Sequence, residues 1–284
     1  MNDFSEFVPN VHFELIPIRN LVSNQEYQRS ISVSHIKRTS EHFDLYQINP
    51  VKVSRRDGIN YVFNGQHTIE IVATVSGSRD TPVWCMVYDD MDYMVEADVF
   101  ANQQKYVKSL SPYEIFSANI EAGNETQLLI KDLVESYHLT VSGANKTSGS
   151  ICAVSALEWI LEKYGFHVLD RTLRLVVSTW EGEAYSLSGN MLKGIARLIV
   201  VYGDDLKDEL FKDRVGSYSA REVSRTAKER RAGSLGYAEA LLLAYNRRTK
   251  SGTLKWNRLY AGKHTKGEEP DDYEDSYEQS MLDE

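Results

Sequence analysis

The chain has 284 residues, of which 42% are hydrophobic and 26% are charged, a composition typical of a folded globular protein with more than one domain. It contains no run of 18 uncharged apolar residues and no basic or apolar N-terminal leader, so we expect a cytoplasmic protein without a membrane span. The formal net charge of −9 does not exclude a polyanion partner, because nine of the 41 acidic residues lie in 267–284 and the other 32 balance the 32 Lys and Arg.

The first half of the chain alternates short apolar runs with turn residues. Strands are predicted at 15–18, 49–53, 61–63 and 83–87, and helices at 34–43 and 68–75. The sequence Arg56-Asp57-Gly58 is typical of a hairpin turn. Cys85 and Cys152 have no zinc-type spacing, so we interpret both as buried and unreactive. Residues 1–108 are therefore predicted to form a small mixed α/β domain.

From about residue 109 the pattern changes to helical periodicity. The sequence SPYE at Ser111 to Glu114 has a capping serine, a proline at the first helical position and a glutamate at the third. The sequence SARE at Ser219 to Glu222 repeats the capping pattern. Further helices are expected at 125–137, 150–164, 171–180, 188–202, 220–231 and 234–248. We therefore predict an α+β chain, with an all-α domain over 109–262 and an acidic, disordered tail over 263–284.

The C-terminal part has a marked charge asymmetry. Residues 212–266 contain 14 Lys and Arg but only four Asp and Glu, and the acidic tail follows directly. Lys and Arg contacts to phosphates supply most non-specific affinity for nucleic acid, so we expect a nucleic-acid partner, most simply DNA. A solvated helix face is the alternative. The predicted nucleic-acid-binding residues are Arg221, Arg225, Lys228, Arg230, Arg231, Arg247, Arg248 and Lys250. Tyr218, Tyr237, Tyr245 and Trp256 either stack on bases or belong to the core.

Three short segments occur in a fixed order in the first half of the chain. The sequence NQEYQR at 24–29 precedes a predicted helix, NGQH at 64–67 follows the hairpin, and FANQQK at 100–105 leads into LSPYE at 110–114. In this order they resemble the N-terminal domain of ParB-like proteins, which has the ParB/sulfiredoxin fold, over roughly residues 12–115. The whole chain is similar to a group of bacterial and phage or mobile-element proteins in which such a domain precedes a helical region.

The resemblance implies a site for the triphosphate and magnesium of CTP at the glycine-led segment. Gly65 matches the glycine of that motif and Gln66 matches its glutamate, while His67 and Thr68 stand at its two arginines. Two fixed cations are therefore missing. Sulfiredoxin has its catalytic cysteine directly after this glycine, and Gln66 at that position makes sulfinic-acid repair an unsuitable function for this chain.

The second segment also lacks a charged residue of the family pattern. Asn102 and Gln104 are kept, Lys105 replaces an arginine, and Ala101 replaces a glutamate that helps to hold the metal. We assign no catalytic residue and no metal ligand, and the cofactor implied is a nucleoside triphosphate with Mg²⁺. The predicted phosphate- or nucleotide-binding residues are Gln28, Arg29, Asn64, Gly65, Gln66, His67, Thr68, Asn102, Gln104 and Lys105.

The corner at Gly65 has properties that suit an anion even without the resemblance. Glycine permits a positive φ and a close approach to the main chain, and a helix N-terminus attracts negative charge. His67 and Thr68 can add hydrogen bonds to phosphate oxygens. The alternative is structural: Asn64 and Gly65 only make a turn, Thr68 caps the helix, and His67 bonds within the fold. The residue pattern alone leaves both interpretations open.

Three functions follow from these observations. The leading hypothesis is a nucleic-acid-binding protein with a degenerate ParB-like domain, encoded by a phage or mobile element. The second is a nucleotide-dependent phosphohydrolase or nuclease. The third is a protein-interaction module that inhibits a nucleic-acid enzyme through its acidic tail. Homo-oligomerisation is compatible with all three.

Overall fold

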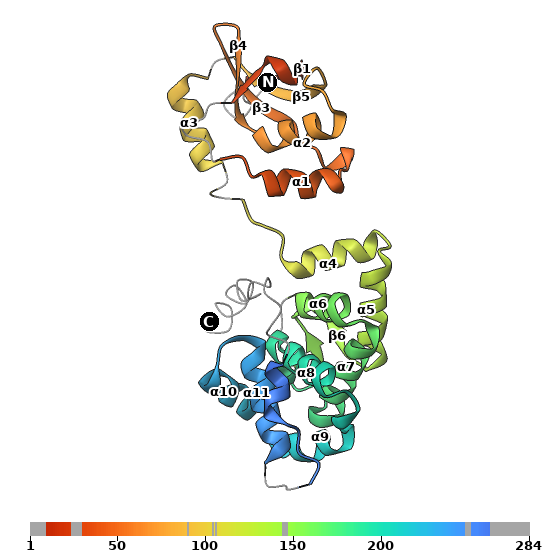
Figure 1. The fold of residues 1–284 in the computed structure, drawn as a ribbon. Helices are drawn as coiled ribbons and strands as arrows, with labels where there is room; N and C mark the ends of the chain where they lie inside the picture. The colour runs from red at the N-terminus through yellow and green to blue at the C-terminus, as the bar shows by residue number, and fades with distance from the viewer. Residues whose placement is uncertain are drawn as a thin grey trace, which may run out of the picture. The chain divides into compact units, whose positions relative to one another are not determined.

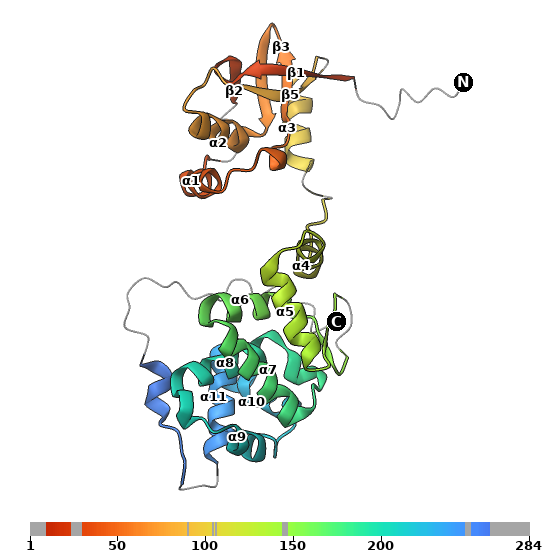
Figure 2. The same ribbon diagram turned by 90° about the vertical axis from the view of Figure 1, so that its right-hand side faces the viewer.

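The computed structural model describes residues 10–23, 30–89, 91–103, 105, 107–143, 147–247 and 251–261. The chain forms two compact units that divide between Ser109 and Leu110, and the fold is α+β (Figures 1 and 2). Among the described residues, no helix is long and apolar enough to cross a membrane. Five predicted site residues and the acidic tail lie outside the described residues: Gln28, Arg29, Gln104, Arg248 and Lys250.

The first unit is built on a five-stranded mixed sheet in the order β1-β5-β3-β4-β2. The strands are β1 (Val11–Pro17), β2 (Leu21–Ser23), β3 (Val51–Arg56), β4 (Ile59–Asn64) and β5 (Pro82–Tyr88). β3 and β4 form the expected antiparallel hairpin, whereas β5 pairs in parallel with β3 and β2 in parallel with β4. At the hairpin turn, Asp57 and Gly58 have φ of 52° and 75°, which explains the Asp-Gly pair.

Helices pack against both faces of this sheet, although Phe13, Leu15 and Trp84 on β1 and β5 stay exposed. On one side lie α2 (Gln66–Ser76) and α1 (Val33–Glu41), next to each other (Figure 1). The apolar core under α2 includes Val53, Cys85 and Ile69. Burial raises the pKa of the Cys85 thiol to about 11, in agreement with an unreactive cysteine, whereas Cys152 is only half-buried, contrary to expectation. On the other side, α3 (Tyr93–Asn102) contacts β4.

The second unit is a helical bundle with α8 (Gly189–Tyr202) at its centre, since α8 packs against α6, α7 and α11. The helices around it, in chain order, are α4 (Pro112–Glu121), α5 (Glu125–Ser136), α6 (Val154–Tyr164), α7 (Phe166–Trp180), α9 (Asp208–Val215), α10 (Ala220–Arg230) and α11 (Gly233–Asn246). Nine residues of α8 are buried. The hydrophobic effect of burying α8 therefore stabilises the contacts among its neighbouring helices.

The prediction of a purely helical second half is wrong at one place. Thr140–Val141 (β6) and Ser150–Ile151 (β7) form a short parallel pair. The helix predicted from residue 150 therefore begins only at Val154. Ser150 and Ile151 are buried in the extended pair, so pairing with Thr140 and Val141 overrides their local helical pattern.

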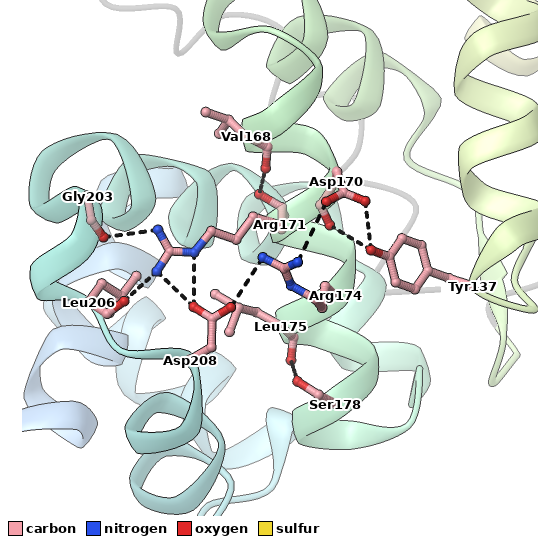
Figure 3. A network of polar contacts seen from close by, with 11 residues as sticks. Tyr137, Val168, Asp170, Arg171, Arg174, Leu175, Ser178, Gly203, Leu206 and Asp208 are labelled. Atoms are coloured by element: carbon pink, nitrogen blue, oxygen red, sulfur yellow. Dashed lines mark hydrogen bonds and ion pairs between the residues drawn. The ribbon is translucent and has the colours of Figure 1, made fainter.

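A polar network fixes α9 against α7 (Figure 3). Arg171 Nε donates to Asp208 Oδ1 over 2.9 Å. The guanidinium of Arg171 also donates to the main-chain carbonyls of Gly203 and Leu206. Arg174 Nη2 lies 3.3 Å from the other Asp208 oxygen. Two arginines thus share one carboxylate, which orients α9 more specifically than apolar contacts alone.

Candidate functional site

The corner between β4 and α2 depends on a glycine. Gly65 is the N-cap of α2 and has φ 103° and ψ 15°, a left-handed conformation that side chains disfavour. A Cβ at this position would lie 3.2 Å from both Cα and Cγ2 of Val51. Glycine is therefore needed for the backbone angle and for the close approach of the two segments. The helix starts at Gln66, so the alternative in which Thr68 caps it is wrong.

The partial positive charge at the N-terminus of α2 is not neutralised within its first turn. Its N-cap, Gly65, has no side chain that could cap the helix, and the first turn contains no acidic residue. Gln66 is buried, with 6% of its surface exposed, so it belongs to the packing of the corner. His67 and Thr68 are half-buried. The main chain of this turn is therefore the principal anion-attracting element, through the aligned peptide dipoles of the helix.

His67 links the N-terminus of α2 to that of α1. The main-chain N–H of Ser32 donates to His67 Nε2 over 3.2 Å, so this nitrogen is the acceptor and the neutral ring carries its proton on Nδ1. Ser32 is the N-cap of α1, whose first turn also lacks an acidic residue. The ring of His35 stands edge-on to His67 at a centroid distance of 5.5 Å. Two helix N-termini and two imidazoles therefore gather at one place.

The end of α3 meets the same corner. Asn64 Nδ2, at the end of β4, donates to Gln103 Oε1 over 2.9 Å, and Gln103 is the C-cap of α3. Asn102 is exposed, and its amide donates to the main-chain and side-chain oxygens of Asp98 within the helix. Lys105 is exposed, and its main-chain N–H donates to the carbonyl of Asn102. The two sequence segments are thus joined through Gln103, which sequence reasoning did not select.

The residues do not fit a metal where the resemblance would place one. Ala101 has only a methyl group at the position of the carboxylate, and Asn102 is bonded to Asp98. No group of three or more His, Cys, Asp or Glu side chains in the described part of the chain is arranged to hold a metal ion. The chemistry that these described residues support is anion binding through N–H donors, and Lys105 follows the end of α3 as an exposed cation.

The predicted basic surface separates into two parts in the structure. Arg221, Arg225 and Lys228 are exposed on α10 at spacings of four and three residues, so they share one helix face. They line a broad groove of about 790 Å³. Tyr185 contributes to the same groove, and its ring centroid lies 5.7 Å from the Arg221 guanidinium carbon.

The other arginines of the set that the structure describes, Arg230, Arg231 and Arg247, contact neighbouring side chains. Arg230 Nε donates to Glu239 Oε2 over 3.1 Å, and Arg231 Nε lies 3.9 Å from the other oxygen of Glu239. Glu239 is 5% exposed, so this cluster fixes α10 to α11. Arg247 Nη1 donates to the hydroxyl of Tyr218 over 2.7 Å.

The aromatic residues near the basic segment differ in their burial. Tyr237 and Tyr245 are buried in the core. Tyr218 and Trp256 are half-buried, and each lies under an arginine, Arg247 and Arg230 respectively. Tyr185 is 45% exposed, and no pattern in the sequence singled it out.

The chain belongs to a family of unknown function, DUF6551, whose model matches residues 22–257. No curated protein matches the sequence. Among solved structures, the chain is similar to the C-terminally truncated chromosome-partitioning protein ParB from Caulobacter crescentus complexed with CTP-γ-S. The identity is 16% and the TM-score is 0.34, over 82% of this chain and 97% of that chain. None of these comparisons supports the expected phage or mobile-element origin.

Proposed function

We propose that this chain is a nucleic-acid-binding protein whose first unit is a degenerate ParB-like domain that binds a phosphate group, of a nucleotide or of a strand. The observation that carries the proposal is the hydrogen bond from Asn64 to Gln103. It supports the proposal because it brings to one corner the two segments that ParB-like proteins use for phosphate.

The electrostatics of the corner favour an anion. The N-termini of α1 and α2 meet through the contact of Ser32 with His67, and neither first turn contains a carboxylate. Each helix terminus contributes about 0.3–1 kcal/mol to the binding of a negative charge. Contributions of this size are too small to bind a phosphate alone, so we expect further contacts from other groups on the protein. Lys105, which is exposed beside the end of α3, is the cation that we expect to contact it.

The proposed function is binding rather than catalysis. Ala101 stands where the resemblance requires a carboxylate for Mg²⁺, and His67 Nε2 accepts the Ser32 N–H. A nitrogen in this bond is not available as a general base toward a ligand. The corner therefore positions a phosphate, and the exposed face of α10 adds contacts to the backbone of a nucleic acid.

The test uses the full chain in a fluorescence anisotropy titration against labelled DNA and RNA across a series of salt concentrations. Counterion release predicts that affinity falls linearly with salt on logarithmic axes. A thermal-shift screen of nucleoside triphosphates, with and without Mg²⁺, asks in parallel whether a free nucleotide stabilises the native form.

Lys105→Ala provides the site-specific variant, and Lys108→Ala, which removes an exposed lysine outside the motif, is its matched control. We expect Lys105→Ala to weaken binding and to reduce the slope of log affinity against log salt by about one, the value for one lost phosphate contact. Lys108→Ala should stay close to the wild type. Absence of binding to any nucleic acid at low salt, together with no thermal shift by any nucleotide, would refute the proposed function.

A further inference from the structure

Tyr185 is an exposed aromatic side chain on an anchored turn. It lies in a 3₁₀ turn, η4 (Ala184–Leu187), that packs against α8 and α10. The two residues that follow it, Ser186 and Leu187, are buried, and its own N–H donates to the carboxylate of Glu183 over 3.2 Å. The backbone under the ring is thus fixed, while 45% of the residue remains open to solvent. A ring held in this way can stack on a planar ligand with little loss of conformational entropy.

Three cations continue from this ring along α10. The Arg221 guanidinium lies against Tyr185, and Arg225 and Lys228 follow on the same exposed face. From Arg221 to Lys228 the helix rises about 10 Å, roughly the length of three stacked nucleotides at about 3.4 Å each. The groove thus combines one aromatic platform with a row of cations of matching length.

Two acidic residues of the groove, Glu222 and Glu229, offset only part of the positive charge of the three cations. Glu222 accepts hydrogen bonds from the main-chain N–H and the hydroxyl of Ser219, at 2.9 and 2.8 Å. These bonds hold its carboxylate at the helix N-terminus and lower its pKa. Glu229 is exposed in the groove, where its charge opposes a polyanion near Lys228. The positive residues are therefore in the majority on this face.

We infer that the groove of α10 binds single-stranded nucleic acid, with a base stacked on Tyr185 and its phosphates next to Arg221, Arg225 and Lys228. This inference rests on the proposed nucleic-acid-binding function and specifies the form of the ligand. A duplex keeps its bases paired and stacked inside, so it offers phosphates to the cations but no base face to the ring. A single strand offers both, and aromatic stacking with a basic groove is the general physical basis of single-strand binding.

The experiment measures the affinity of the full chain for a labelled oligothymidylate and for a duplex of the same length, at about 50 mM salt. Tyr185→Ala is expected to weaken binding of the single strand about tenfold, because one lost base stack has that magnitude. Tyr185→Phe keeps the ring and is expected to stay within about twofold of the wild type. Tyr46→Ala, at a tyrosine that is 97% exposed in the other unit, is the matched control.

The charge variants separate this inference from the function on which it rests. Arg225→Ala and Lys228→Ala should weaken single strand and duplex alike, and Lys212→Ala on α9 serves as the exposed control. If the charge variants weaken binding but Tyr185→Ala does not, or if the wild type prefers the duplex, the inference is overturned and the proposed function stands. If no nucleic acid binds the wild type, both are overturned.

Discussion

Glu96 of α3 is completely buried, and its carboxylate accepts a hydrogen bond from Arg56 Nη1 at the end of β3. The same guanidinium lies 4.3 Å from the ring centroid of Tyr61. This ion pair holds α3 on the sheet and so determines where its C-terminus, with Gln103, meets the corner at Gly65. A structural pair thus positions the candidate site without belonging to it.

Substitution of Glu96 tests this role. Glu96→Ala leaves Arg56, whose side chain is 22% exposed, without its buried partner, and loss of one member of a buried ion pair costs about 3–5 kcal/mol. We expect the unfolding free energy of the first unit to fall by an amount of that order in a urea titration. Glu14→Ala removes the exposed partner of Arg55 instead and should cost at most about 1 kcal/mol. Equal losses for the two variants would contradict the structural role of α3.

Gln103→Ala tests the junction between the two segments. Its side-chain oxygen accepts the Asn64 amide over 2.9 Å, and an intramolecular hydrogen bond of this kind contributes about 1 kcal/mol. We expect a loss of stability of this size and weaker stabilisation by a nucleoside triphosphate in a thermal-shift assay. Asn102→Ala removes only bonds to Asp98 within α3. If Asn102→Ala reduces ligand stabilisation more than Gln103→Ala, the junction is not the site.

Much of the architecture follows from the sequence because local signals agree with the fold. Both capping boxes form, at Ser111 with Glu114 and at Ser219 with Glu222. Among the long helices of the second unit, α7 and α10 each bury one face, whereas α11 is buried on most sides. Most ends of these helices were predicted to within a few residues. By contrast, α3 escaped prediction because YMVEADVFAN has apolar residues on several sides and hence no single stripe. α9 was also not predicted, because it has only eight residues and is rich in charge.

The candidate site was predictable where a motif carried it and not where pairing decided it. Gly65 was found because the turn needs glycine. Gln103 gave no signal, since its role depends on a partner 39 residues away in sequence. Arg230 and Arg231 were assigned to the nucleic-acid surface by charge, whereas the turn between α10 and α11 brings Glu239 to both. Side-chain pairing of this kind appears only after tertiary folding.

Tyr137 makes the second unit sensitive to high pH. Burial and the adjacent Asp170 raise the pKa of its hydroxyl to about 12, and its O–H donates to Asp170 Oδ1 over 2.7 Å (Figure 3). Because the folded-state pKa lies above the unfolded value, stability is fully present below about pH 10 and is lost as pH rises toward about 12. We expect Tyr137→Phe to flatten this part of the pH dependence in chemical denaturation. The same slope in both proteins would show that Tyr137 does not contribute to it.

Gly65→Ala measures how tightly the corner is built. Alanine at φ 103° is strained, and its methyl group would also lie 3.2 Å from the main chain of Val51. Gly77, the C-cap of the same helix, has φ 70°, and a Cβ there would meet no atom within 4 Å, so Gly77→Ala carries the backbone strain alone, about 1–2 kcal/mol. We therefore expect Gly65→Ala to lose more unfolding free energy than Gly77→Ala, since Val51 at 0% exposure has no room to move. The difference between the two variants, measured in urea, reports the close approach of Gly65 to Val51 together with the greater strain of φ 103°, which lies further than φ 70° from the left-handed values that L residues adopt most readily. If the two losses are equal, the glycine serves only the turn, and a phosphate would have to be held by groups other than the main chain of this corner.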